Sequence, residues 1–289
     1  MTPPAAAPGP AGGRPAPLSS DRLVALDAAL VAGVTVAILF AARDWVVMSG
    51  VVAAAFVVRL ACLALVPRAE RGLSLGAEAT LHVGLAVLGG FNDWNSVCHH
   101  RIYEYTVPVD LPAWSTIPTW MLFYWGQILR LIATVARWPR LGPPAAASDT
   151  VWLGRHAVRS AGLKIALELG LLFGTRQCIY RLWAHPVASW LPFAIALVAG
   201  AVLFRPRAYE LRLIALVMVA GPLAEIAYIA AGLHRYALGW FGGVPLWIVL
   251  WWGLAVLLFS DLATRALAWL AQRPARAEPG APGSAVPAA

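Results

Sequence analysis

Long apolar stretches recur along the whole chain and constrain its fold more than any other feature. Eight of them follow one another: 22–41, 45–66, 73–92, 114–136, 160–180, 186–204, 211–233 and 244–270. A helix needs about 20 mostly apolar residues to cross a bilayer, because the hydrocarbon core is about 30 Å thick and a helix rises about 1.5 Å per residue. The pattern therefore predicts an all-α fold, a polytopic transmembrane helical bundle of about eight spans.

Composition and charge support this class. The chain is 60% hydrophobic and 12% charged, whereas about a quarter of the residues of a soluble domain are charged. The apolar runs lack a polar face, which excludes amphipathic surface helices. The net charge is +8, but the basic residues flank the runs and form no continuous patch. We therefore expect the lipid bilayer as a partner and no nucleic acid.

The basic residues also predict an orientation. Of the 22 Lys and Arg residues, 15 fall in the N-terminal tail, the even-numbered loops and the C-terminal tail, and 5 fall in the odd-numbered loops. Arg59 and Arg130 lie inside apolar runs. Because cytoplasmic loops carry the excess of positive charge, both termini are expected in the cytoplasm. The chain would then be a multi-pass protein of the cell inner membrane.

The domain organisation follows from the runs and the segments between them. Residues 1–19 are rich in Pro, Ala and Gly and predict a disordered tail, as do residues 273–289. Residues 20–137 and 160–272 would each hold four spans. Residues 138–159, with Gly142-Pro143-Pro144, are expected to form the longest cytoplasmic linker.

Two matched spacings indicate an internal repeat. Fifteen residues separate a Gly from a Tyr in each half, and eight separate a Pro from a Gly: Gly90 to Tyr105 and Gly221 to Tyr236, then Pro118 to Gly126 and Pro245 to Gly253. Because four spans return the chain to the same side, the two four-helix repeats would be parallel, with a site between them. The two prolines also have a local interpretation, which is that they only start the fourth and eighth spans.

Ionisable residues inside spans are costly and therefore are candidates for function. Glu78 and His82 interrupt the third run, share one helix face and are expected to pair with each other. Asp93 lies near the same face, and His100 returns to it if the helix continues. Glu168 interrupts the fifth run one turn after Lys164 and is expected to form an ion pair. Arg59 and its acidic partner cannot be matched from the sequence.

Glu225 is the most isolated acid, since residues 217–231 contain no other charge. In the repeat it aligns with Trp94, one residue after Asp93, so the two acids are expected at similar depth near the outer half of the bilayer. An apolar environment favours the neutral form of a carboxylic acid, which suits proton donation. The alternative is a structural hydrogen bond to a neighbouring helix.

The segment from His99 to Tyr105 is the densest polar cluster. A metal site is conceivable there with His82, His99, His100 and Asp93. However, membrane desaturases and hydroxylases have three His-rich boxes and this chain has one His-His pair, so no metal is expected. A plain interfacial loop is the alternative. The three cysteines form no CxxC pair, and a bridge between Cys98 and Cys178 is left open.

One segment resembles a known family. Gly221-x-x-x-Glu225, Gly232, Tyr236, Gly243-Val244-Pro245-Leu246-Trp247 and Trp251 are similar to the pattern of the integral-membrane carotenoid-biosynthesis proteins, a group that includes the bacterioruberin-type carotenoid hydratases. The resemblance covers residues 221–253, with a degenerate echo at 90–126. There Trp94 stands where the family pattern has Glu, which puts an acid role in the first half in doubt and leaves it to Asp93.

The resemblance implies a chemistry. Hydration, cyclisation or isomerisation of a polyene begins when a neutral carboxylic acid protonates a double bond, and aromatic faces stabilise the resulting carbocation. The expected proton donors are Glu225 and Asp93, and no cofactor is needed. The residues expected to contact the substrate are Tyr105, Tyr236, Trp120, Trp247, Trp251, His82, His100, Glu104 and Arg235.

Three functions are compatible with the sequence. The first is an enzyme of isoprenoid, carotenoid or other lipid metabolism that acts on a membrane-dissolved substrate. The second is a membrane transporter or lipid carrier with a site between the two repeats. The third is a non-catalytic membrane scaffold, in which the intramembrane acids are dispensable.

Overall fold

The computed structural model describes residues 18–142 and 148–272, so the expected tails at 1–19 and 273–289 lie almost wholly outside the described residues. Within this part of the chain, eight long helices form the bundle: α1 (Asp21–Ala41), α2 (Trp45–Ala64), α4 (Leu75–Trp94), α5 (Thr119–Val135), α6 (Ala161–Leu182), α7 (Leu191–Phe204), α8 (Ala208–Ala230) and α9 (Leu246–Gln272). A short helix, α3 (Arg68–Arg71), joins α2 to α4. Each long helix overlaps one of the eight apolar runs, which confirms the all-α prediction.

Four of these helices, α1, α2, α8 and α9, are long and apolar enough to cross a membrane, and α7 is a shorter apolar helix. By length and composition they are compatible with a transmembrane protein, as the apolar runs predicted. The remaining long helices, α4, α5 and α6, carry buried ionisable residues.

The helices begin where the sequence supplies a cap. Ser20, Ser74 and Ser160 accept a hydrogen bond from the backbone N–H three residues later, at 3.2–3.3 Å, and Asp44 caps α2 in the same way. These bonds satisfy N–H groups that a helix start leaves free. Pro118 is the N-cap of α5, and Pro245 directly precedes α9, so both prolines start helices as the local interpretation predicted.

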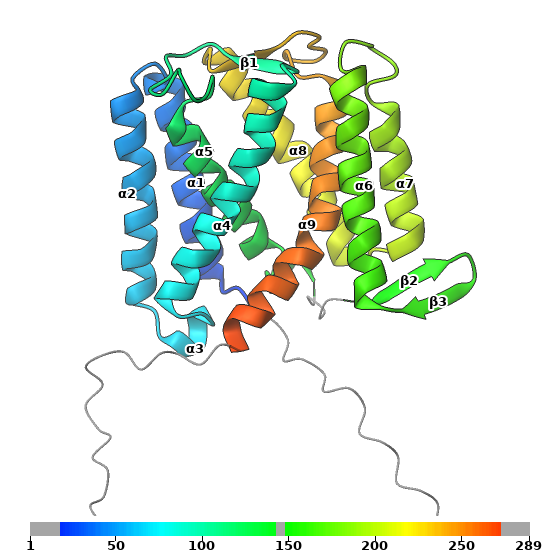
Figure 1. The fold of residues 1–289 in the computed structure, drawn as a ribbon. Coiled ribbons are helices and arrows are strands. Elements are labelled where there is room, and N and C mark those ends of the chain that lie inside the picture. Colours follow the sequence, from blue (N-terminus) through cyan, green and yellow to red (C-terminus); the bar gives the residue numbers. More distant parts are fainter. Residues whose placement is uncertain (1–17, 143–147, 273–289) are drawn as a thin grey trace, which may run out of the picture.

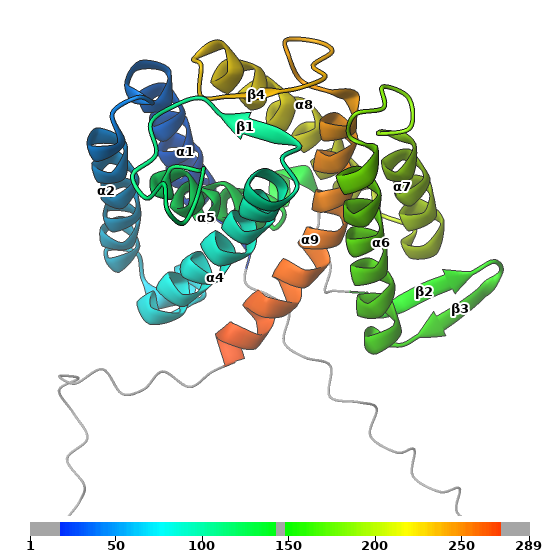
Figure 2. The same ribbon diagram turned by 45° about the horizontal axis from the view of Figure 1, so that its top comes forward.

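The long helices run side by side, and the described ends of the chain lie at the same face of the bundle (Figure 1). Helices α1 and α2 occupy one flank and α6 and α7 the other, with α4, α5, α8 and α9 between them (Figures 1 and 2).

Two small antiparallel sheets cap the bundle at opposite ends. Strand β1 (Tyr103–Tyr105) pairs with β4 (His234–Tyr236), with Glu104 opposite Arg235, across the face away from the termini (Figure 2). Strands β2 (Thr150–Leu153) and β3 (His156–Arg159) form a hairpin at the other end. The segment 138–159, expected as a linker, thus contains this hairpin in its described part.

A network of buried charges holds the first half together. Arg59 Nε on α2 lies 2.6 Å from Asp27 Oδ1 on α1, and its Nη1 lies 3.0 Å from Glu78 Oε2 on α4. Arg130 on α5 donates to both oxygens of Glu78 at 2.9–3.1 Å. Thr134 donates to Asp27 at 2.6 Å and closes the network. The four charged side chains are nearly inaccessible, so their charges are neutralised inside the protein.

The expected pairing of Glu78 with His82 is therefore wrong. Two guanidinium groups satisfy the Glu78 carboxylate, and their positive charge disfavours a charged imidazole nearby. The His82 ring instead packs on Phe56, with 4.6 Å between ring centroids. In the sequence, His82 is the i,i+4 neighbour of Glu78. The two arginines that pair with Glu78 come from other helices and carry the positive charge that complements its carboxylate.

Removing one member of this network is expected to destabilise the protein strongly. Glu78→Gln leaves two buried guanidinium groups with one carboxylate, and breaking a buried pair costs about 3–5 kcal/mol. We expect a midpoint of thermal unfolding several degrees below that of the wild type in detergent. Glu104→Gln is the matched control, because its ion pair with Arg235 is exposed and exposed pairs contribute about 0–1 kcal/mol. Equal midpoints for the two variants would contradict the assigned network.

Candidate functional site

An apolar cavity of about 220 Å³ lies between α1, α5 and α8, with Trp252 of α9 on one side. Eight leucine, isoleucine and valine side chains line its wall, among them Val31, Ile128, Leu131, Ile132 and Val217. Leu216, on the same wall, has 46% of its surface exposed. The wall at Leu216 therefore lies at the outer surface of the bundle.

One end of this cavity is polar. Glu225 from α8 and His234 from β4 line it together with the rings of Tyr103, Tyr105 and Tyr228. We call this set the polar end of the cavity. Strands β1 and β4 deliver three of these residues, because the two strands cross the end of the bundle directly above α8 (Figure 2).

Glu225 is the acid that faces the cavity. Tyr236 donates its hydroxyl to Glu225 Oε2 at 3.1 Å. His234 Nε2 lies 2.8 Å from the same oxygen, but the ring N–H is not aligned with it, so the contact is electrostatic rather than a formed hydrogen bond. The Glu225 side chain is 13% exposed. It therefore combines access to the cavity with two polar neighbours, Tyr236 and His234.

Asp93 lies behind the cavity wall rather than on it. Its Oδ2 accepts hydrogen bonds from the Tyr105 hydroxyl at 2.7 Å and from Trp125 Nε1 at 3.0 Å. Its Oδ1 is buried and has no hydrogen-bond partner among the described residues. Tyr105 and Trp125 both line the cavity. The two expected proton donors thus differ: Glu225 faces the space, and Asp93 orients two side chains that do.

The phenols at this end remain protonated donors. Burial and the neighbouring Asp93 carboxylate hold the pKa of Tyr105 well above its usual range. Burial and the Glu225 carboxylate do the same for the pKa of Tyr236. Each phenol therefore keeps its proton and donates it in a hydrogen bond, Tyr105 to Asp93 and Tyr236 to Glu225.

Aromatic rings enclose His234. Four tyrosine rings have centroids 5.5–6.4 Å from that of the imidazole: Tyr103, Tyr105, Tyr228 and Tyr236. Ring faces carry negative potential and stabilise a cation held against them. The polar end can therefore support positive charge on a bound molecule.

A cluster of hydroxyl groups borders the cavity at Thr35 of α1. Thr35 Oγ1 lies 2.9 Å from the Tyr124 hydroxyl and 3.1 Å from that of Tyr228, and the two phenols are 3.2 Å apart. Tyr124 also donates to the carbonyl of Val31. The cluster joins α1, α5 and α8, the three helices that form the cavity, and so fixes its width.

A second, larger pocket of about 740 Å³ lies on the outer side of β1 and β4. Glu104 and Arg235 form an ion pair across the two strands on its wall. Tyr103 and Tyr105 line both this pocket and the apolar cavity. Tyr103 and Tyr105 therefore lie between the apolar cavity and this larger pocket.

The other residues expected at the site lie elsewhere. Trp120 is fully buried in the core beside α1 and α2. Trp247 packs between Phe193 and Tyr236, and the Arg176 guanidinium lies 4.8 Å from the centroid of the Trp251 ring. His82 packs on Phe56. His100 stacks on Tyr180 at 3.6 Å. Of the expected substrate contacts, Tyr105 alone lines the apolar cavity, and Tyr236 supports Glu225.

Sequence reasoning missed His234, Tyr103, Tyr228 and Thr35. A signal existed for the first two, because each stands two residues before a repeat tyrosine, Tyr236 or Tyr105. Thr35 and Tyr228 lie in apolar runs and carry no such signal. The three cysteines are free thiols. No group of three or more His, Cys, Asp or Glu residues suited to a metal ion occurs in the part of the chain that the structure describes.

Comparisons with known proteins identify a shared fold. No protein-family model matches the chain, and no curated protein matches it. Among solved structures, the chain is similar to a crystal structure of a cross-linked MvINS trimer, with a TM-score of 0.52 and 21% identity over 70% of this chain and 98% of that one. At this identity the likeness establishes a related helical fold and nothing about function.

Gly221 lies against Trp252 in the wall of the cavity, and a substitution of Gly221 tests this packing. A Cβ atom at position 221 would lie 2.6–2.7 Å from three atoms of the Trp252 ring, so Gly221→Ala must displace the indole into the cavity. Overpacking of this kind costs about 1–3 kcal/mol, and we expect a lower unfolding midpoint. Gly33→Ala on α1 is the control, because nothing lies within 4 Å of its Cβ. A wild-type midpoint for Gly221→Ala would show that Trp252 packs elsewhere.

Proposed function

We propose that all eight long helices cross the membrane, with both termini in the cytoplasm. Their side-by-side arrangement and the position of both described ends at one face support this (Figure 1). The charges in the less apolar helices also fit, because Glu78, Arg130, Lys164 and Glu168 are buried against partners rather than exposed to lipid. The excess of Lys and Arg on the side of the termini supplies the orientation.

Reporter fusions test this topology. A fluorescent protein fused after Gln272 is expected to fluoresce, and alkaline phosphatase fused after Trp183 is expected to be active, because the first reporter works in the cytoplasm and the second outside it. The reciprocal fusions serve as controls. Active phosphatase after Gln272 would contradict the proposal.

We also propose that the two halves arose by duplication. In the β1–β4 pair, Glu104 faces Arg235, and these are equivalent positions when Tyr105 is matched to Tyr236. Two equivalent strands that pair in this register are related by a twofold axis between them. Trp125 and Trp252, matched by the Pro-to-Gly spacing, stack with centroids 5.9 Å apart, which places them near the same axis.

Contacts between the helices refine the alignment. Added Cβ atoms at Gly89 and Gly221 would meet Trp125 and Trp252, respectively, so these glycines are equivalent and Asp93, rather than Trp94, corresponds to Glu225. The first half then has one extra residue between the acid and the tyrosine. The π-helical segment Asn95–His99 accounts for it, because π-helical turns commonly accommodate single insertions.

For the activity, we propose an enzyme that acts on a membrane-dissolved isoprenoid or other unsaturated lipid, with Glu225 as the proton donor. The observation that carries this is a carboxyl group at the end of an apolar cavity whose wall at Leu216 lies at the outer surface of the bundle. A binding module needs no ionisable group there, and such groups are costly inside membranes. No cofactor is required.

The proposed step balances with water alone. Neutral Glu225 gives its proton to one carbon of a double bond, and the positive charge forms on the other carbon. The faces of Tyr103, Tyr105 and Tyr228 stabilise this cation. Water adds to this cation and then loses a proton to the Glu225 carboxylate, which completes a hydration. Alternatively, the cation itself loses a different proton to the Glu225 carboxylate, which completes an isomerisation. Water can come from the outer pocket past Tyr103 and Tyr105, which line both spaces.

Deuterium labelling tests this chemistry for any lipid product, whatever its identity. Membranes with the wild-type protein, incubated in D₂O, are expected to form a lipid with one non-exchangeable C–D bond. Glu225→Gln should lower its rate of formation by about 10²–10⁴, the usual contribution of a general acid. Glu70→Gln on α3 is the matched control. The first source of substrate is a lycopene-producing host, whose pigments are profiled with and without the gene.

The outcomes separate the functions. If pigments match the empty host, carotenoids are excluded as substrates. If membranes with the wild-type protein form no more deuterium-labelled lipid than membranes with Glu225→Gln, the proposed proton donation by Glu225 is wrong. A lipid carrier is the second candidate, favoured by the two spaces that meet at Tyr103 and Tyr105. It predicts lipid that co-purifies unchanged and is lost when the cavity is filled by Ala224→Trp.

A further inference from the structure

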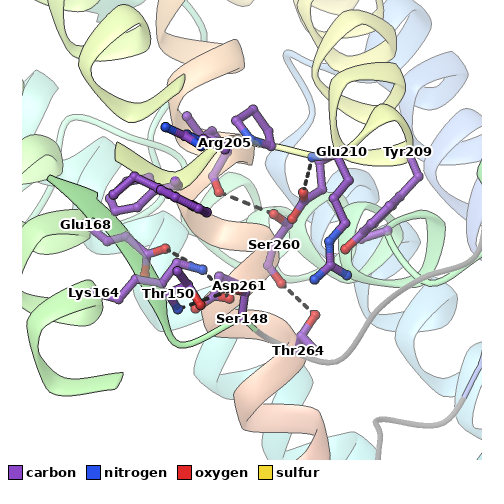
Figure 3. A pocket seen from close by; sticks show the side chains of 16 residues that line it. Ser148, Thr150, Lys164, Glu168, Arg205, Tyr209, Glu210, Ser260, Asp261 and Thr264 are labelled. Carbon is purple, nitrogen blue, oxygen red and sulfur yellow. Dashed lines mark hydrogen bonds and ion pairs between the residues drawn. The ribbon is translucent and has the colours of Figure 1, made fainter. Parts of the chain in front are cut away.

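A polar cavity of about 240 Å³ lies at the opposite end of the second half, near the β2–β3 hairpin (Figure 3). Helices α6, α8 and α9 form its walls. It shares no lining residue with the apolar cavity, and the proposed reaction does not use it.

Ion pairs surround the floor of this cavity but do not balance. Lys164 Nζ lies 2.8 Å from Asp261 Oδ1 and 3.6 Å from Glu168 Oε1. Arg265 lies 2.7 Å from Asp261 and 2.9 Å from Asp149. The connected group has two cations and three carboxylates, which gives a net charge of 2 − 3 = −1 when all are ionised. Asp149 is 53% exposed to solvent, so the buried carboxylate that lacks a close cation is Glu168, because Lys164 lies nearer to Asp261. An unmatched buried negative charge is unfavourable, so Glu168 favours a positively charged group in the cavity.

Glu168 identifies where such a group belongs. Its side chain is 1% exposed, and it lines the cavity (Figure 3). Its Oε2 atom is buried and has no hydrogen-bond partner within the described ranges of the chain. A buried carboxylate oxygen without a donor is costly. The missing partner is therefore a hydrogen-bond donor, and the charge of the cluster favours a cationic one.

The mouth of the cavity has two arginines against one acid, Glu210, whose Oε2 accepts a hydrogen bond from the backbone N–H of Arg207 at 2.6 Å. Arg205 and Arg207 line it from the turn between α7 and α8, and both are exposed. The Arg205 guanidinium lies 3.6 Å from the centroid of the Trp152 ring, which holds it at the rim. An anionic group at the mouth would meet these two cations, while a donor at the floor meets Glu168.

We infer that this cavity binds a molecule that carries a primary ammonium group a few atoms from a phosphate. The ammonium donates to Glu168 Oε2, and the phosphate lies toward Arg205 and Arg207. A quaternary ammonium group has no N–H to donate and is excluded from this role. The headgroup of an aminophospholipid and free phosphoethanolamine share the required chemistry and differ in their source.

Binding is measured on the full-length protein with both sources. Native mass spectrometry records lipid retention from nanodiscs of phosphatidylethanolamine or phosphatidylcholine, and titration in detergent records the effect of free phosphoethanolamine on Trp fluorescence. Wild-type protein is expected to retain phosphatidylethanolamine in preference to phosphatidylcholine or to bind free phosphoethanolamine. The first result assigns the site to a lipid and the second to a soluble ligand.

Two variants assign the binding to this cavity. Glu168→Gln removes the charge at the floor and is expected to weaken binding roughly tenfold or more, because it removes a charge-assisted hydrogen bond. Arg207→Gln, on the exposed rim, tests the phosphate contact without a risk to folding and should weaken binding severalfold. Glu70→Gln is the control and should bind like the wild type.

Three results would overturn the inference. The first is equal retention of the two lipids without any binding of phosphoethanolamine, which would leave only a proton or water at Glu168. The second is wild-type binding by a folded Glu168→Gln variant. The third is wild-type binding by Arg207→Gln, which would show that the phosphate does not bind at the mouth.

Discussion

Lipid offers neither hydrogen bonds nor counter-ions, so a polar group buried in a membrane bundle needs its partner inside the protein. Asp27, Arg59, Glu78 and Arg130 meet this requirement completely. Their four side chains come from four different helices, α1, α2, α4 and α5, so a shift of any one helix would leave a charge unmatched. The first half is thereby fixed as one rigid unit, and it supplies the α1 and α5 walls of the apolar cavity.

A buried polar group that lacks such a partner indicates a candidate functional site. Glu225 faces a cavity with one hydrogen-bond donor, Tyr236, on a single oxygen. Glu168 leaves a buried oxygen unpartnered in the described structure, also at a cavity. Asp93 has an unpartnered oxygen too, but Tyr105 and Trp125 separate it from the open space. Unmatched polar atoms beside a cavity can be satisfied by a ligand, whereas the Asp93 arrangement serves to hold its two donors.

The sequence predicted the helices well because an apolar run of membrane-spanning length has few alternative structures. It did not predict which charges pair. Partner choice depends on the rotation of each helix about its axis, which apolar runs without a polar face do not specify. Glu78 illustrates this: its neighbour His82 is four residues away, yet the arginines on α2 and α5 win because they carry full positive charges. Asp27 was also missed as a member of the network, because its partners Arg59 and Thr134 come from α2 and α5.

The site was predicted in part. Glu225 was found because a lone acid in an apolar run is conspicuous, and Tyr105 and Tyr236 because the repeat spacing marked them. His234 was not, although it occupies the position in β4 that Tyr103 occupies in β1. Its importance depends on the pairing of β1 with β4, two strands more than a hundred residues apart, and no local pattern specifies that contact.

The proposed duplication explains why two equivalent acids have different surroundings. A twofold axis between Glu104 and Arg235 would relate two identical sites, one in each half. An extended substrate that lies across this axis would fill both, so a second substrate molecule could not bind. Only one acid can then face the reacting bond. The Asp93 carboxylate has become a fixed acceptor for Tyr105 and Trp125, both of which line the cavity beside Glu225. In the proposed reaction, the first half contributes wall and orientation, the second contributes the proton, and the two halves form one site that neither would form alone.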